Sequence, residues 1–158
     1  MINKVQNLII HKKLMKIKGY IDILALGCCM TPFLRDHDIL RVVPVNAFYE
    51  GQIVVICFAD SLKAHRVITV NHCACTITTK GDNAINAEIV DFSNVIGVVT
   101  GVYRESQWIW FEYSYQDCEI AKLSKSVNDF YKCCGSIEKT MLSNEYRTLL
   151  LCIKESLK

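Results

Sequence analysis

Three kinds of side chain that acyl transfer requires occur in order along this chain: a thiol, an imidazole and a carboxylate. Cys29 follows an apolar stretch and precedes a charged turn, so we expect its thiol at the edge of a sheet, partly open to solvent. His65 comes next, on a β-rich stretch, and Asp82 and Glu88 follow it. The order predicts that the Cys29 sulfur attacks a carbonyl carbon while His65 acts as the base.

The protonation chemistry of cysteine and histidine suits these roles near neutral pH. A free thiol has a pKa of about 8.5, and an adjacent imidazolium lowers the pKa of the thiol. Histidine needs no large pKa shift to act as a base there. Asp82 or Glu88 would orient His65, and Asp91 is a third candidate. The backbone N–H of Cys29 and a second donor nearby would hold the oxyanion.

A structural interpretation of the same residues stands beside the catalytic one. Cysteine is among the most often buried residue types, so Cys29 could be packing without reactivity. A histidine on a β-rich stretch is more often structural than catalytic, and Asp82 suits a tight turn with its neighbours Gly81 and Asn83. The alternative hypothesis is a protein that binds peptides without cleaving them.

The middle of the chain is built of short β-rich stretches separated by turn residues. The predicted strands cover residues 21–26, 39–45, 52–58, 64–70, 75–79, 87–91, 95–103 and 107–113. Short strands with no helices between them favour a coiled antiparallel sheet or a partly open barrel.

Helical periodicity marks both ends of the chain. Residues 4–18 predict a short amphipathic helix with five lysines and no acidic residue, ended by Gly19. From residue 116 one apolar stripe runs to Cys134, and Gly135 and Ser136 then suit a helix end and the cap of a second helix. We therefore expect three parts, namely a basic helix over 1–19, a β domain over 20–115 and a helical hairpin over 116–158. The fold class is α+β, mainly β, and the hairpin packs on the sheet or holds a protein partner.

Composition restricts the class of protein. The chain has 158 residues, 51% of them hydrophobic, which is enough for a core, and a net charge of +2, which is too small to indicate nucleic acid binding. No apolar run approaches the roughly 18 residues of a membrane span, and no signal peptide pattern is present, so we expect a cytoplasmic location. The basic N-terminal helix is either a solvated face or a contact for an anionic membrane or an acidic partner.

The cysteines and glycines predict neither a disulfide framework nor a cofactor. Nine cysteines, an odd number with two adjacent pairs, indicate free thiols. The stretch from His72 to Cys75 lacks a second Cys/His pair at zinc-like spacing, and no glycine loop suits a phosphate. We therefore predict no metal and no cofactor.

Six short motifs together resemble the superfamily of signal peptidase I and the LexA-like serine peptidases. They lie at residues 27–32, 38–40, 51–55, 65–68, 79–83 and 95–99, and the resemblance spans roughly residues 20–103. In that superfamily the residue two after the motif glycine, here Gly27, is the nucleophilic serine, and this chain has Cys29 there. His65 stands before Arg66 as in the archaeal and endoplasmic-reticulum type, whereas the bacterial type has lysine. The resemblance matches the supporting aspartate of that type to Glu88, and Asp82 to the aspartate of the motif itself.

The resemblance implies an endopeptidase on a signal-peptidase-like coiled sheet. Such enzymes bind an extended peptide as an added strand beside the nucleophile, which would place Gly27, Met30 and Pro32 against the substrate. With cysteine as the nucleophile, the acyl-enzyme would be a thioester. The expected task is processing of a cytoplasmic precursor or leader peptide. The alternative is an inactive adaptor that keeps the peptide groove and joins an assembly through its C-terminal helices.

Overall fold

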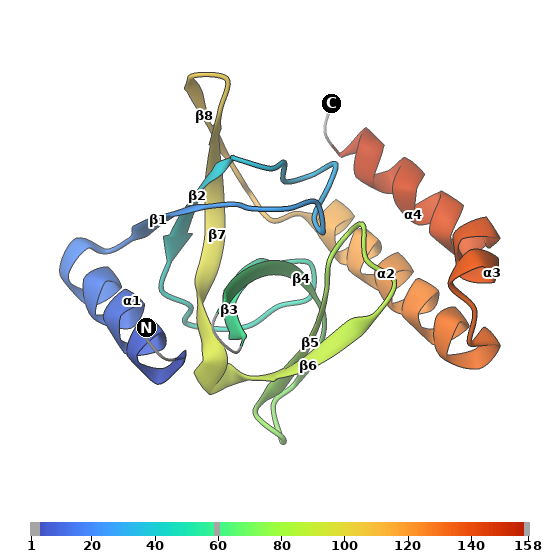
Figure 1. Cartoon of the computed structure of the whole chain (residues 1–158), viewed down its shortest axis with the longest axis horizontal. Helices are drawn as coiled ribbons and strands as arrows, with labels where there is room; N and C mark the ends of the chain where they lie inside the picture. The colour runs from blue at the N-terminus through green and yellow to red at the C-terminus, as the bar shows by residue number, and fades with distance from the viewer. Residues whose placement is uncertain (1–3, 59–60, 157–158) are drawn as a thin grey trace.

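The computed structural model describes residues 4–58 and 61–156. Positions 1–3, 59–60 and 157–158, which include the outer ends of the predicted basic helix and helical hairpin, lie outside the described residues. The described strands form one antiparallel sheet in the order β1-β2-β7-β3-β4-β5-β6, and β8 pairs with β7. The sheet curls into a half-barrel with helices outside it (Figure 1). The predicted α+β fold, mainly a coiled antiparallel sheet with C-terminal helices, is confirmed.

The strands have the bounds β1 (Ile21–Leu24), β2 (Ile39–Val43), β3 (Ile53–Phe58), β4 (Ser61–Asn71), β5 (Thr76–Lys80), β6 (Ala87–Asp91), β7 (Val95–Arg104) and β8 (Gln107–Trp110), with a 3-10 turn η1 (Phe92–Asn94) before β7. β8 is shorter than predicted because Tyr113 turns inward, where its hydroxyl accepts a hydrogen bond from the Ile53 N–H at 3.0 Å. β4 is longer than predicted because it pairs with β3 back to Ser61. The start of β4 was not predicted because Ser61 and Lys63 are polar and resemble turn residues.

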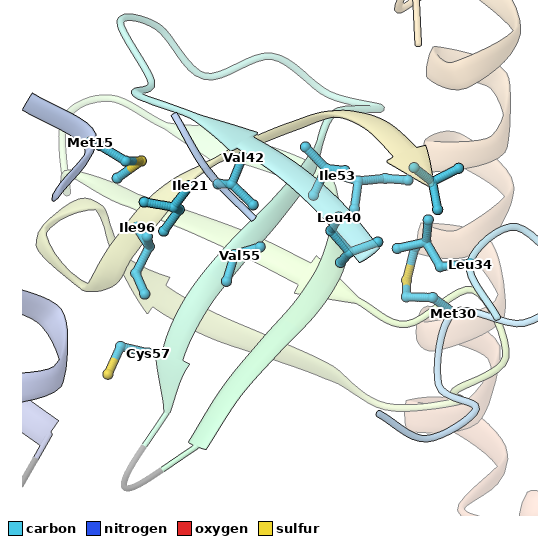
Figure 2. Close-up of a cluster of buried hydrophobic side chains, with 12 residues drawn as sticks. Met15, Ile21, Met30, Leu34, Leu40, Val42, Ile53, Val55, Cys57 and Ile96 are labelled. Atoms are coloured by element: carbon cyan, nitrogen blue, oxygen red, sulfur yellow. The ribbon is translucent and has the colours of Figure 1, made fainter. Parts of the chain in front are cut away.

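One buried apolar cluster connects the sheet to the long turn between β1 and β2. Met30 and Leu34 of that turn are each 3% exposed and pack with Leu40 of β2 and Val55 of β3 (Figure 2). A loop that places two large side chains in the core has few alternative positions. The cluster therefore fixes the turn that carries Cys29.

α1 (Lys4–Lys18) packs against the same cluster through Met15, which is 3% exposed. The helix ends at Gly19, which has a φ of +79° and donates its N–H to the Met15 carbonyl at 2.8 Å. The predicted helix over residues 4–18 is confirmed.

The C-terminal helices are α2 (Tyr115–Cys134), α3 (Ile137–Leu142) and α4 (Asn144–Glu155). As predicted, Gly135 adopts the left-handed conformation at the end of α2, and Ser136 caps α3. The second helix of the predicted hairpin is instead two helices, because Ser143 ends α3 and caps α4 by accepting the Tyr146 N–H at 3.2 Å. Ile120 and Val127 of α2 pack against buried side chains of α4.

α2 also packs on the sheet. The side-chain oxygen of Asn128 accepts the backbone N–H of Ala87 in β6 at 3.0 Å, and the Cys118 thiol reaches the carbonyl of Glu50 at 3.5 Å. These contacts place α2 against the region of the sheet that carries the candidate site. In the part of the chain that the structure describes, no helix is both long and apolar enough to cross a membrane.

Candidate functional site

Cys29 lies in the turn between β1 and β2, which is held at both of its ends. The N–H of Gly27 donates to the carboxylate of Asp36 at 2.7 Å, and the N–H of Ala25 donates to the carbonyl of Asp38 at 2.8 Å. The Asp38 carboxylate is 4% exposed and binds the guanidinium of Arg104 from β7. These hydrogen bonds close the turn into a compact loop beside the sheet.

The turn between β5 and β6 supports Cys29 from the other side. The N–H of Asn83 donates to the Cys29 carbonyl at 2.8 Å, and the Asn83 amide donates to the carbonyl of Cys28 at 3.2 Å. A Cβ on Gly81 would lie 2.5 Å from the Cys29 carbonyl oxygen, so only glycine allows this close approach. The turn at residues 81–83 thus holds the main chain of the cysteine pair in place.

The Cys29 thiol is half-buried and lines a cavity of about 80 Å³. Its sulfur donates a long hydrogen bond of 3.9 Å to the carbonyl of Ala64 in β4. Gly27 and Met30 also line the cavity. Pro32, which follows a cis peptide bond, is outside the set of described lining residues. The other lining residues are mainly apolar and include the charged Arg35 and Lys63; the apolar ones are Ile23, Leu24, Ala25, Leu26, Leu34, Leu40, Val55, Leu62 and Ala64.

One wall of the cavity is an open edge of β4. This strand pairs with β3 along residues 61–66 and with β5 along residues 66–71. Among the described residues, the segment 62–65 therefore has a strand neighbour on one side only. Backbone groups at such an edge are available for pairing with another extended segment. The thiol lies beside this edge.

His65 and Glu88 lie next to each other. The imidazole is buried, and its Nδ1 lies 3.7 Å from Oε2 of Glu88. Neither of these two atoms has a hydrogen-bond partner among the described residues. The other carboxylate oxygen of Glu88 accepts the Lys63 ammonium at 2.8 Å. Of the three acidic candidates, Glu88 is the one that the structure places beside the imidazole.

The other two acidic candidates lie elsewhere. Both oxygens of Asp82 accept from the guanidinium of Arg66 at 2.9 Å, in a pair that is fully buried. Arg66 also binds Asp117 of α2 at 3.0 Å. Asp91 is at the far end of β6, opposite Thr76. Asp82 therefore has a structural partner, and its charge raises the pKa of His65 less than the charge of Glu88 does.

Burial sets the protonation states of the thiol and the imidazole. It raises the pKa of Cys29, and the nearby charge of Lys63 opposes that shift only in part. Burial lowers the pKa of His65, although Glu88 acts in the opposite direction. At neutral pH the site therefore holds a protonated thiol and a neutral imidazole. This differs from the expectation that an imidazolium lowers the thiol pKa, because removal from water outweighs the charges nearby.

The structure does not join the thiol and the imidazole directly. No hydrogen bond between Cys29 and His65 occurs among the described residues, and the sulfur donates instead to the carbonyl of Ala64, the residue before His65. A thiol–imidazole contact thus stays a prediction. What the fold does bring together is a thiol, an open strand edge and, on that same strand, an imidazole with a carboxylate beside it.

Two lysines at the site were missed by the sequence reasoning. Lys63 lines the cavity with Cys29 and binds Glu88. Its position two residues before His65 on one strand would place both side chains on the same face, which was the available signal. Lys80 is fully buried, and burial lowers its pKa to about 8. A lysine beside a turn motif has the pattern of a solvated charge, so no sequence signal distinguished it.

Comparisons with family models, with curated proteins and with solved structures found no match to this chain. Among residues 4–58 and 61–156, no group of three or more His, Cys, Asp or Glu side chains is placed to hold a metal ion.

Proposed function

We propose that this protein is a cysteine-dependent endopeptidase of the signal-peptidase and LexA-like kind, with Cys29 as nucleophile, His65 as base and Glu88 orienting the imidazole. One observation carries the proposal, namely the cavity in which the Cys29 thiol lies beside the open edge of β4. The same strand carries His65, with Glu88 3.7 Å from the ring. The expected substrate is an extended precursor or leader peptide in the cytoplasm.

The open edge of β4 supports binding of a peptide as an added strand. Along residues 62–65 the described part of β4 pairs with β3 on one side and with no strand on the other, and the segment 24–27 forms the facing wall of the cavity. Main-chain hydrogen bonds would supply affinity, and the cavity would select side chains at alternate positions of the peptide. Its small volume and apolar lining favour small uncharged side chains next to the bond that is cut.

The proposed reaction begins from the neutral pair of groups. As the peptide binds, His65 accepts the proton of the Cys29 thiol, and the sulfur attacks the peptide carbonyl carbon. The C–N bond then breaks, the proton passes from His65 to the departing amine, and a thioester remains on Cys29. Water attacks the thioester, giving its proton to His65, and the sulfur leaves and is reprotonated. Glu88 stabilises the imidazolium during both steps.

A second function, peptide binding without cleavage, is favoured by a different observation. Burial raises the pKa of the Cys29 thiol, and no hydrogen bond connects that thiol to His65 among the described residues. A groove with an unactivated thiol would bind an extended chain and release it unchanged. The C-terminal helices would then join a protein partner.

Mass spectrometry of acid-quenched reactions distinguishes the two functions. The purified protein is incubated under reducing conditions with a mixed-sequence peptide library, and cleavage products and acylated protein are measured together. We expect new peptide termini and an acyl adduct on the tryptic fragment that contains Cys29. Cys29→Ala should remove both, whereas Cys28→Ala, which changes the exposed neighbouring thiol, should keep both. Peptide binding with no adduct and no cleavage would refute the peptidase and support the binding protein.

A further inference from the structure

The outward face of α1 carries a row of aliphatic side chains that the fold leaves in solvent. Ile10, Leu14 and Ile17 are spaced at i, i+4 and i+7, so they lie on one side of the helix. Their exposed fractions are 43%, 40% and 81%. We call this row, together with the exposed lysines beside it, the α1 face: Ile10, Lys13, Leu14, Lys16, Ile17 and Lys18.

The packing of α1 does not use this row. The helix contacts the sheet through Met15 and Leu8, on the opposite side, and Lys12 donates to the carbonyl of Ser93 at 2.8 Å. A helix that only had to cover a sheet would have polar residues on its outer side. The exposed aliphatic row is therefore available to a partner outside the fold.

The charge around the row is of one sign. At 100° per residue, Lys13 lies about 40° from Ile17 on one flank of the row and Lys18 about 40° from Leu14 on the other. Lys16 lies beyond Lys13, toward the side of the helix that faces the sheet. The helix holds five lysines and no acidic residue, so the rest of the chain has 13 basic and 16 acidic side chains. The positive charge of this protein is thus concentrated in α1. An aliphatic row between lysines is the pattern of a helix that lies in the interface of an anionic membrane.

An aromatic side chain continues the surface beyond the helix. A crevice between α1 and β1 is lined by Leu14, Lys18, Tyr20 and the first residues of β1. Tyr20 is 39% exposed, and the guanidinium of Arg41 lies 3.9 Å from its ring. A tyrosine ring suits the headgroup level. The charge of Arg41 is paired with Asp22 of β1, so the positive charge available to lipid comes from the lysines of α1.

We propose that the α1 face docks on an anionic phospholipid surface, with the helix axis parallel to the membrane. The aliphatic row would enter the boundary between headgroups and acyl chains, and the lysines would contact lipid phosphates. Charge complementarity selects this partner. A second copy of the chain would bring two sets of five lysines together, and a nucleic acid would cover the aliphatic row with phosphates. The proposal does not depend on the peptidase activity.

Co-sedimentation with vesicles tests the proposal. The reduced full chain is mixed with vesicles of phosphatidylcholine alone or of phosphatidylcholine with phosphatidylglycerol. We expect binding to the anionic vesicles only, and weaker binding as salt is added. A variant with Lys13→Gln, Lys16→Gln and Lys18→Gln should lose on the order of 100-fold in partition coefficient, because each such lysine contributes about fivefold.

A second pair of variants tests the apolar part and controls for folding. The set Ile10→Gln, Leu14→Gln and Ile17→Gln should bind much more weakly than the wild type. The control set Met141→Gln, Leu142→Gln and Leu151→Gln changes three comparably exposed side chains on α3 and α4, at the other end of the molecule (Figure 1), and should bind like the wild type. Circular dichroism checks that each variant is folded.

Three results would overturn the proposal. One is absence of binding to either kind of vesicle, and another is equal loss of binding in the α1 and control sets. The third is a dimer of the wild-type chain without lipid, seen by light scattering, that the α1 set alone dissociates. That result would assign the α1 face to a contact between copies.

Discussion

The buried ammonium of Lys80 gives the most direct physical test of the region that supports Cys29. Lys80 is fully buried and donates a hydrogen bond of 3.2 Å to the carbonyl of Gly81, in the turn that holds the Cys29 main chain. Burial lowers its pKa from 10.5 to about 8, and the charge of Asp82 opposes that shift only in part. The unfolded chain would keep the ordinary value. Between pH 8 and 10.5 the unfolded chain therefore binds this proton more strongly than the folded protein does.

The sign and size of the effect follow from proton linkage. Stability rises with pH wherever the unfolded state binds more protons, so the free energy of unfolding should rise between about pH 8 and 10.5. Each pKa unit corresponds to about 1.4 kcal/mol, and the fall from 10.5 to about 8 thus gives a contribution on the order of 3 kcal/mol. Below pH 8 Lys80 is charged in both states and adds no slope.

Urea unfolding followed by circular dichroism, at several pH values from 7.5 to 10.5, measures this contribution. Lys80→Met removes the titrating group and keeps an unbranched side chain, so the difference in unfolding free energy between wild type and variant should change by about 3 kcal/mol over that range. Taking the difference cancels the other groups that titrate there. Lys125→Met, which changes an exposed lysine of α2, is the matched control and should follow the wild type. Parallel curves for wild type and Lys80→Met would refute the reasoning, since they would mean that the ammonium is hydrated in the folded protein.

Three further predictions concern the site itself. Lys63→Met should slow alkylation of Cys29 by iodoacetamide at pH 8 by about 2- to 5-fold, because the Lys63 charge lowers the pKa of that thiol. Quantitative mass spectrometry of the Cys29 fragment measures the rate, and an unchanged rate would contradict the prediction. Gly81→Ala should lower the free energy of unfolding by about 1–3 kcal/mol, since the added Cβ would lie 2.5 Å from the Cys29 carbonyl oxygen and the two turns must separate. Urea unfolding measures this loss, and an unchanged unfolding midpoint would show that the turns separate at no cost in stability. Burial lowers the pKa of His65 from 6.5, so the free energy of unfolding of the wild type should fall as the pH drops below about 6.5. In His65→Gln the unfolding midpoint should depend less on pH over this range. The same pH dependence in wild type and variant would exclude His65 as the cause.

The elements of this fold were accessible to sequence reasoning where the signal is local. Apolar alternation and turn residues located each of the eight strands in the described part of the chain, and glycine located the end of α1 and of α2. The break between α3 and α4 was not accessible, because the apolar stripe continues across it. Ser143 ends one helix and caps the next through its own side chain. A serine within a helical pattern does not by itself predict such a break.

The candidate site was only partly accessible, because its pairings depend on strand register. Cys29 and the turn at residues 81–83 were both expected near the site, and the structure places them in contact. The choice between Asp82 and Glu88 stayed open. It depends on the register of β4 with β5, which sets Arg66 opposite Lys80 and near the carboxylate of Asp82. A register is a property of two strands together, and no single stretch of sequence specifies it.

The same register connects the C-terminal helices to the site. Arg66 is fully buried and needs both of its acidic partners, because an unpaired buried charge costs several kcal/mol. Asp82 supplies one carboxylate from the turn below Cys29, and Asp117 supplies the other from the first turn of α2. Removal of α2 would leave Arg66 with one acidic partner, Asp82, and with the Gly51 carbonyl, and would open its surroundings to water. The Arg66 guanidinium of β4 thus connects the turn that supports Cys29 with α2, because it binds a carboxylate from each.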